Sequence, residues 1–308
     1  MMTIELANTQ NYKQVVFDSL DISEATKKDY TYRIDLFLEF LRTEQFTVNT
    51  FLHYKQILAS RTDYSVSTKN KYLTTARIFL KELHRRGHIP VDTTLNIKSF
   101  KQSKKHKVAG LDDEDIARLT NYLQSLSNSP VDLRLRAMIA LLLFQGLRQV
   151  EIVRLNVEDL DFIAKRAYVR SKGSDDTEPI HLHPETIKAV RSYLRAYSRS
   201  HGSLFTPLSG NATARLTTRG LRKIVQTALH KAGVDKTVHG FRHYYATKLI
   251  KSYKGDLLRV ASYTRHSNLE MLQVYNDSID DTEDLPRYYE VFESINLDTT
   301  RTAVPLVK

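Results

Sequence analysis

The sequence predicts a mainly α-helical protein with a small β-hairpin or sheet, divided into two domains. Apolar residues recur at helical spacing in segments such as 23–45 and 67–87. Residues 157–182 instead alternate apolar and polar positions around a Ser-Lys-Gly-Ser-Asp-Asp turn, which indicates two short strands. Residues 99–110 are polar and basic with almost nothing to bury, which is typical of a linker.

These boundaries divide a chain of 308 residues, a length sufficient for two hydrophobic cores. We predict a poorly structured leader over residues 1–20, an N-terminal helical domain over 21–100, a basic linker over 101–110 and a C-terminal domain over 111–308 that ends in a tail helix. In the first domain, helices are expected from Ser23, over residues 48–60, and from Ser67, whose hydroxyl can cap a helix that stops at Gly87.

In the second domain, the spacing predicts a series of helices around the hairpin. They are expected over residues 111–126, 132–146, 184–198, 217–232, 239–251 and 257–263. The amphipathic tail helix beyond residue 276 either caps its own domain or docks on a neighbouring protomer.

Composition favours a cytoplasmic protein with a polyanionic partner. The longest apolar run, Ala137 to Phe144, is far shorter than the roughly 20 residues that a membrane span needs, and the first residues lack the pattern of a secretory signal. The chain has no cysteine, which excludes disulfides, thiolate metal sites and cysteine nucleophiles, and which fits a reducing compartment. No membrane partner is expected. The net charge of +11 favours nucleic acid.

Most of that charge lies in one stretch. Between Arg61 and Lys107 there are 12 lysines and arginines but only three acidic residues. In the helix of residues 67–87 the basic side chains mostly avoid the apolar stripe, so they are either an ordinary solvated face or phosphate contacts. We favour contacts to double-stranded DNA, with the linker as a strap along the phosphates, and the candidate residues are Lys69, Lys71, Arg77, Lys81, Lys104, Lys105 and Lys107.

Three short motifs follow one another from residue 146 onward. Arg148 and Glu151 lie in GLRQVEI, and His239 and Arg242 stand three residues apart in HGFRH, so they share one face of a helix. His266 then precedes Tyr275 by nine residues. Each motif alone is unremarkable, but their order and spacing together are hard to attribute to chance.

In this set the chain resembles the tyrosine recombinases, the phage-type integrases and Xer-type recombinases. The resemblance rests on specific motifs from roughly residue 105 to the end, and on helical pattern and charge before that. It implies an N-terminal core-binding domain, a C-terminal catalytic domain, and a lysine in a hairpin turn, which matches Lys172. It also implies a homotetramer on two DNA sites, with protomers monomeric or weakly associated off DNA.

The implied reaction is phosphoryl transfer from DNA to a tyrosine and back to a DNA hydroxyl, with no metal, ATP or other cofactor. Arg148 and Arg242 would neutralise the phosphate, because guanidinium groups offer fixed donors to its oxygens. Tyr275 would attack as a phenolate, with His239 as base or proton relay.

The remaining roles follow from the resemblance as well. Lys172 would protonate the leaving 5′-oxygen, His266 would donate a hydrogen bond to the phosphate, and Glu151 would orient a neighbouring side chain. Taken singly, each residue also has an ordinary explanation: Arg148 as a helix C-cap, Lys172 or Lys165 as a surface lysine, Glu151 as a solvent-facing residue, His266 as a structural cap.

The pairs His181 with His183 and Asp159 with Asp161 form no recognisable metal ligand set, so we predict no metal requirement.

The family usually has glycine before the second histidine, whereas Arg265 stands there. Since glycine tolerates conformations that arginine avoids, the turn towards Tyr275 is expected to differ.

The predicted function is therefore site-specific DNA recombination through a covalent 3′-phosphotyrosine intermediate, in integration, excision or resolution. Two alternatives remain: a non-catalytic DNA-binding regulator on the same scaffold, and a type IB topoisomerase-like nicking and closing enzyme. Removal of the tail helix separates a recombinase from a topoisomerase, because synapsis by a recombinase needs it and relaxation by a topoisomerase does not. The short leader favours the simpler recombinases over the larger phage integrases.

Overall fold

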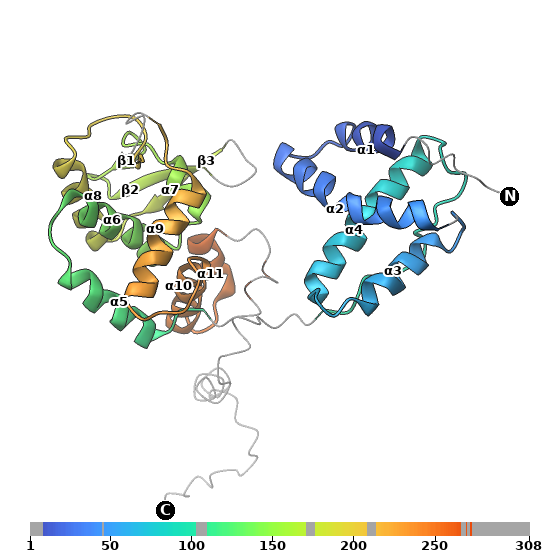
Figure 1. The fold of residues 1–308 in the computed structure, drawn as a ribbon. Coiled ribbons are helices and arrows are strands. Elements are labelled where there is room, and N and C mark those ends of the chain that lie inside the picture. Colours follow the sequence, from blue (N-terminus) through green and yellow to red (C-terminus); the bar gives the residue numbers. More distant parts are fainter. Residues whose placement is uncertain are drawn as a thin grey trace, which may run out of the picture. The chain divides into compact units, whose positions relative to one another are not determined.

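The computed structural model describes residues 9–44, 46–102, 110–170, 176–207, 214–265, 269 and 272. The chain divides into two compact units, Met1–Lys104 and Lys105–Lys308. The predicted mainly α-helical fold with a small sheet is confirmed (Figure 1). None of the helices in the described ranges has the length and apolarity that crossing a membrane requires.

The described residues of the first unit form a bundle of four helices, whose bounds are α1 Thr9–Asp18, α2 Glu24–Thr43, α3 Thr50–Ser60 and α4 Val66–Arg85. Serine caps begin the two long helices: the hydroxyl of Ser23 accepts a hydrogen bond from the backbone N of Thr26, and that of Ser65 from Thr68. The aromatic rings of Phe37, Phe51, Tyr54 and Phe79 fill the core between them.

Two expectations for this unit were wrong. The part of the leader that the structure describes is helical over Thr9–Asp18, because α1 packs against α2 and α4 and buries Val16 and Phe17 in the core. The cap of α4 is Ser65 rather than Ser67, since it is the Ser65 hydroxyl that accepts the N–H of the first turn. For α1, the burial of Val16 and Phe17 explains why so short a segment is helical.

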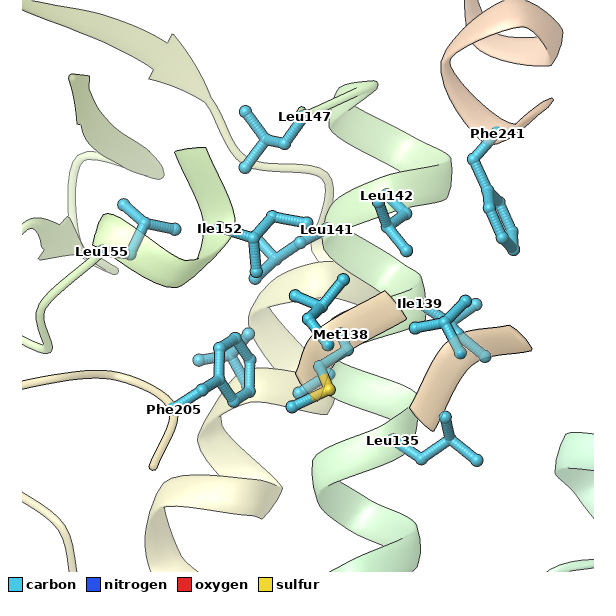
Figure 2. Close-up of a cluster of buried hydrophobic side chains, with 14 of the residues drawn as sticks. Leu135, Met138, Ile139, Leu141, Leu142, Leu147, Ile152, Leu155, Phe205 and Phe241 are labelled. Atoms are coloured by element: carbon cyan, nitrogen blue, oxygen red, sulfur yellow. The ribbon is translucent and has the colours of Figure 1, made fainter. Parts of the chain in front are cut away.

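The second unit combines helices with a small sheet. Its elements are α5 Asp113–Ser125, α6 Pro130–Gln145, α7 Gln149–Arg154, β1 Leu160–Asp161, β2 Arg166–Arg170, β3 Thr177–His181, α8 Pro184–Ala196, α9 Thr218–Lys231, α10 His239–Ser252 and α11 Leu257–Thr264. Helix α6 is apolar on nearly every side and lies buried against α8, α9 and α10. Figure 2 shows Ile152 of α7 and Phe241 of α10 on different sides of α6. The central helix therefore fixes the positions of α7 and α10, which carry the candidate site.

The sheet has the order β1-β2-β3, and all its pairs are antiparallel. Strand β2 pairs with β3 from Arg166 opposite His181 to Arg170 opposite Thr177, so the predicted hairpin is present. Ala167 and Val169 point into the core, and their neighbours point outward. The predicted tail helix, like the linker residues Lys104, Lys105 and Lys107, lies outside the described residues.

Candidate active site

Arg148 stands at the junction of α6 and α7. Helix α6 ends at Gly146, whose φ of 56° turns the chain in the left-handed region, and the chain enters α7 with Arg148 as the residue before its first turn. The backbone N of Arg148 donates to Oε2 of Glu151 and its Nη1 donates to Oε1, each over 2.8 Å. Arg148 is thus not a helix C-cap, and 31% of its side chain is exposed.

Glu151 is buried, with a side-chain exposure of 0%, so it is not a solvent-facing helix residue. Its Oε2 also accepts a hydrogen bond of 2.8 Å from Nη2 of Arg265. Burial by itself raises the pKa of Glu151, but the charge of Arg265 and the hydrogen bonds from Arg148 outweigh burial and hold the pKa below its ordinary value. The carboxylate therefore stays ionised between two guanidinium groups.

Arg242 lies on α10 and is only 4% exposed. Its Nη1 donates to the carbonyl oxygen of Gly146 over 2.8 Å, and its Nη2 donates to that of Thr264 over 2.5 Å. Those carbonyls belong to the end of α6 and the end of α11, where helices leave acceptors without intrahelical partners. The Arg242 side chain thus joins Gly146, which lies two residues before Arg148, to Thr264, which precedes Arg265.

His239 begins α10 and is exposed, one turn before the buried Arg242.

The first turns of α10 pack closely against two glycines. A Cβ on Gly146 would overlap the ring of Tyr245, and a Cβ on Gly110 would overlap that of His243, so both rings lie directly on glycine backbone. These two contacts were not predicted from the sequence, although Gly146 is part of the GLR motif that contains Arg148.

Three of the candidate residues, Lys172, His266 and Tyr275, lie outside the described residues. The strands β2 and β3 nevertheless fix where the turn that contains Lys172 begins and ends, since Arg170 pairs with Thr177. The other lysine considered, Lys165, lies in the turn between β1 and β2, at the opposite end of the hairpin.

Arg265 is the residue whose part in the site was missed. It adopts φ 54° and ψ 49°, the left-handed conformation that glycine favours, so the turn keeps the geometry expected of glycine despite the substitution. The rest of the turn towards Tyr275 lies outside the described residues, so the expectation that this turn differs stays a prediction. The signal in the sequence was an arginine where a glycine was expected, but its partner Glu151 lies 114 residues away.

The histidine and aspartate pairs considered for metal binding have structural contacts. Nδ1 of His183 accepts a hydrogen bond from the backbone N of Glu185 at the start of α8. Asp159 accepts from the N of Asn156, and Asp161 caps the turn that follows it. In the ranges that the structure describes, no three His, Asp or Glu side chains gather as a metal site would require.

The basic residues of α4 differ in their surroundings. Lys71 and Lys81 are exposed, ten residues apart on the face that points away from the core. Lys69 donates to the carbonyl oxygen of Ala59 over 2.8 Å. Arg77 turns inward, donating to the carbonyl oxygen of Ile97 over 2.7 Å, and burial lowers its pKa. Of the four, Lys71 and Lys81 are the most open to a ligand.

Comparison with known proteins gives a family match and a related protein. Residues 110–281 match the group described as the phage integrase family. The tyrosine recombinase XerC of Mannheimia succiniciproducens is 29% identical over 209 residues, which cover 66% of this chain and 68% of that protein.

Two solved structures share the fold. The crystal structure of XerH site-specific recombinase bound to palindromic difH substrate, a post-cleavage complex, has a TM-score of 0.70 at 19% identity and covers 93% of this chain and 85% of that one. A lambda integrase tetramer bound to a Holliday junction has a TM-score of 0.65 at 14% identity and covers 87% of this chain and 75% of that one.

Proposed function

Because this chain belongs to the phage integrase family, we propose that Tyr275 is its nucleophile and that Arg148 and Arg242 bind the DNA phosphate which Tyr275 attacks. The resemblance inferred from the order of the motifs is confirmed by that family match. The protein is a tyrosine recombinase, an enzyme that cleaves and rejoins DNA in site-specific recombination.

The observation that carries the assignment of residues is the position of Arg242. Its hydrogen bonds to Gly146 and Thr264 draw together the segments before Arg148 and before Arg265, which are far apart in the sequence. A guanidinium fixed by two carbonyl oxygens needs little reorganisation to meet a phosphate. Preorganised positive charge is what phosphoryl transfer without a metal ion requires.

The proposed chemistry has two steps, cleavage of the strand and its rejoining. The phenolate oxygen of Tyr275 attacks phosphorus, the bond from phosphorus to the 5′-oxygen breaks, and the leaving 5′-oxygen takes up a proton. The 3′-phosphotyrosine keeps the phosphodiester energy, so a 5′-hydroxyl can reverse the step on the same strand or on a partner strand. Free tyrosine has a pKa of about 10, so nearby cations and a base must favour the phenolate.

Proton transfer is assigned to two further residues. Lys172, in the turn between β2 and β3, is proposed to protonate the leaving oxygen, because an ammonium group on a hairpin can reach a bound phosphate. His239 is exposed at the start of α10 and is proposed as the base or relay. His266 is proposed to donate a hydrogen bond to the phosphate.

Double-stranded DNA is the proposed substrate, with a homotetramer on two sites as the active assembly and a monomer or weak oligomer off DNA. The charge of +11 and the exposed lysines of α4 support a polyanionic partner. The likeness to the lambda integrase tetramer supports the assembly. We propose that the protein acts on DNA in the cytoplasm, without a cofactor.

Incubation with nicked duplexes tests this proposal. The duplexes are drawn from DNA that flanks the protein's own gene, no metal is added, and products are resolved on denaturing gels. A nick beside the cleavage point lets the short fragment diffuse away, so the covalent intermediate accumulates. Wild type, Tyr275→Phe and the matched control Tyr263→Phe are compared, each after its DNA affinity has been measured.

We expect a covalent protein–DNA band, joined through the 3′-phosphate, with wild type and with Tyr263→Phe but not with Tyr275→Phe. An adduct that survives in Tyr275→Phe would assign the nucleophile to another tyrosine. If wild type binds a duplex and forms no adduct with it, the catalytic assignment fails and a DNA-binding regulator is the better description.

A further inference from the structure

Arg265 occupies a position that disfavours most side chains. It ends α11 with φ 54° and ψ 49°, in the left-handed region where a Cβ crowds the following carbonyl. Five residues other than glycine adopt positive φ in the described ranges, and Lys254 and Arg265 both lie in this part of the second unit. Lys254 is exposed, whereas 7% of the Arg265 side chain is exposed. Arg265 therefore combines a strained backbone with a buried cation.

The contacts of Arg265 explain what holds it there. Its Nη2 donates to Oε2 of Glu151 over 2.8 Å, and its Nε lies 3.9 Å from Oε2 of Glu178 on β3. Glu151 in turn accepts from the backbone and the side chain of Arg148. One carboxylate thus takes hydrogen bonds from two arginines that come from different helices.

The charges of this cluster do not cancel. Arg148 and Arg265 each carry one positive charge and the buried Glu151 carries one negative charge, so these three sum to a single positive charge. Glu178 adds a negative charge at 3.9 Å from Arg265, but 51% of its side chain is exposed, so solvent screens it far more than the buried Glu151. If residue 265 were neutral, the buried carboxylate would be paired with Arg148 alone, and the pair would have no net charge. Charges interact strongly where water is excluded, so that difference matters for an approaching phosphate.

We propose that Arg265 is a positioning residue that neutralises Glu151 and so leaves the positive charge of Arg148 available to the scissile phosphate. This inference rests on the proposed function. Of the two arginines that contact Glu151, Arg148 is the more exposed, with 31% of its side chain open to solvent against 7% for Arg265. Arg265 stays behind it and contacts the carboxylate.

The alternative is that Arg265 only fastens the end of α11. The two roles differ in what happens when Glu151 also loses its charge. If Arg265 balances charge, the neutral amide in Glu151→Gln no longer offsets Arg148, and the double variant recovers activity. If Arg265 is a fastener, removal of its partner restores nothing, because the contact is already lost.

The test compares single-turnover cleavage of the nicked duplex that wild type cleaves, together with the affinity for that duplex and the thermal unfolding temperature. The variants are Arg265→Gly, Glu151→Gln, the double variant, and the matched control Lys254→Gly. Lys254 has φ 48° and is exposed, so its replacement by glycine relieves the same backbone strain and removes one positive charge away from Glu151.

We expect Arg265→Gly to slow cleavage by about 10- to 100-fold, the size of effect seen when a residue that orients a functional side chain is lost, with DNA affinity almost unchanged. The double variant should cleave at least about fivefold faster than Arg265→Gly, a modest electrostatic recovery. Lys254→Gly should stay within about twofold of wild type, as surface changes usually do. Arg265→Lys and Arg265→Gln keep a long side chain and separate charge from folding: the lysine variant should be the faster.

Two results would overturn the inference while the proposed function stands: Arg265→Gly cleaving at the wild-type rate, or a double variant as slow as Arg265→Gly. If Arg265→Gly does not fold, equal rates for the lysine and glutamine variants overturn it in the same way. A wild-type protein that binds the duplex and never cleaves it overturns the proposed function, and the inference falls with it.

Discussion

Nη1 of Arg242 donates a hydrogen bond of 2.8 Å to the carbonyl oxygen of Gly146, which lies 96 residues earlier in the chain. The bond fixes α10 to the end of α6, immediately before the segment that carries Arg148. It also gives Arg242 a part in folding as well as in phosphate binding, and the two parts can be measured separately.

Replacement of Arg242 by alanine should destabilise the second unit. It would leave the carbonyl oxygens of Gly146 and Thr264 without their donor, at a cost of about 3 kcal/mol in unfolding free energy. Arg242→Lys keeps the charge without the planar fork and should fall between alanine and wild type. Urea unfolding followed by circular dichroism measures the effect. Arg195→Ala, an exposed arginine at the end of α8, should cost less than about 0.5 kcal/mol; equal losses at residues 195 and 242 would contradict the assignment.

The packing of Tyr245 on Gly146 predicts a large effect of a single methyl group. Gly146→Ala places a Cβ so close to Cδ1 of the Tyr245 ring that the two atoms overlap, and leaves alanine at φ 56°. The backbone strain and the displaced ring together should lower the unfolding free energy by about 3 kcal/mol. Gly233→Ala is the control, since Gly233 has φ 73° and open space around its Cβ, and it should cost only about 1 kcal/mol. Similar losses in both variants would mean that the ring moves aside freely.

Glu82 predicts a pH dependence in the first unit. Hydrogen bonds from Arg85, then Arg86 and Ser19, lower the pKa of Glu82 from 4.5 to about 2. Because the pKa is lower in the folded state, the stabilisation is complete above pH 4.5 and disappears as the pH falls towards 2.

The free energy of unfolding of wild type should therefore exceed that of Glu82→Gln by about 2 kcal/mol at neutral pH, and this difference should decrease steadily below pH 4.5. Hydrogen exchange of the α4 amides, corrected for intrinsic rates, follows the first unit alone. A difference in unfolding free energy that is as large near pH 3 as at neutral pH would show that the charge of Glu82 does not provide the stabilisation.

The basic residues of α4 should separate into two classes. Lys71→Ala and Lys81→Ala remove exposed charges, so each should weaken DNA binding for all sequences and lower the salt slope by about one, with little change in stability. Arg77→Ala removes the hydrogen bond to Ile97 and should instead destabilise the first unit by about 1 to 2 kcal/mol. Salt titrations of binding and thermal unfolding measure the two effects. A salt slope that is unchanged in both lysine variants would remove them from the interface.

Local patterns were sufficient for most of the fold. The helices other than α1 and α7 were predicted, as was the hairpin of residues 166–181, because the apolar period and the turn residues are properties of neighbouring positions. Helix α1 was missed, since its reason for folding is the burial of Val16 and Phe17 against helices elsewhere in the unit. The order of the motifs was enough to indicate the family.

The sequence by itself determined which side chains are available for catalysis: two arginines, histidines, a lysine and a tyrosine in a recognisable order. Only the tertiary structure decided how they are held. It buried Glu151 between Arg148 and Arg265, placed Arg242 against two helix ends, and turned Arg77 inward. The physical reason is distance along the chain: periodicity encodes which face of a helix is buried, whereas the partner of a buried charge 114 residues away is set only when the helices pack.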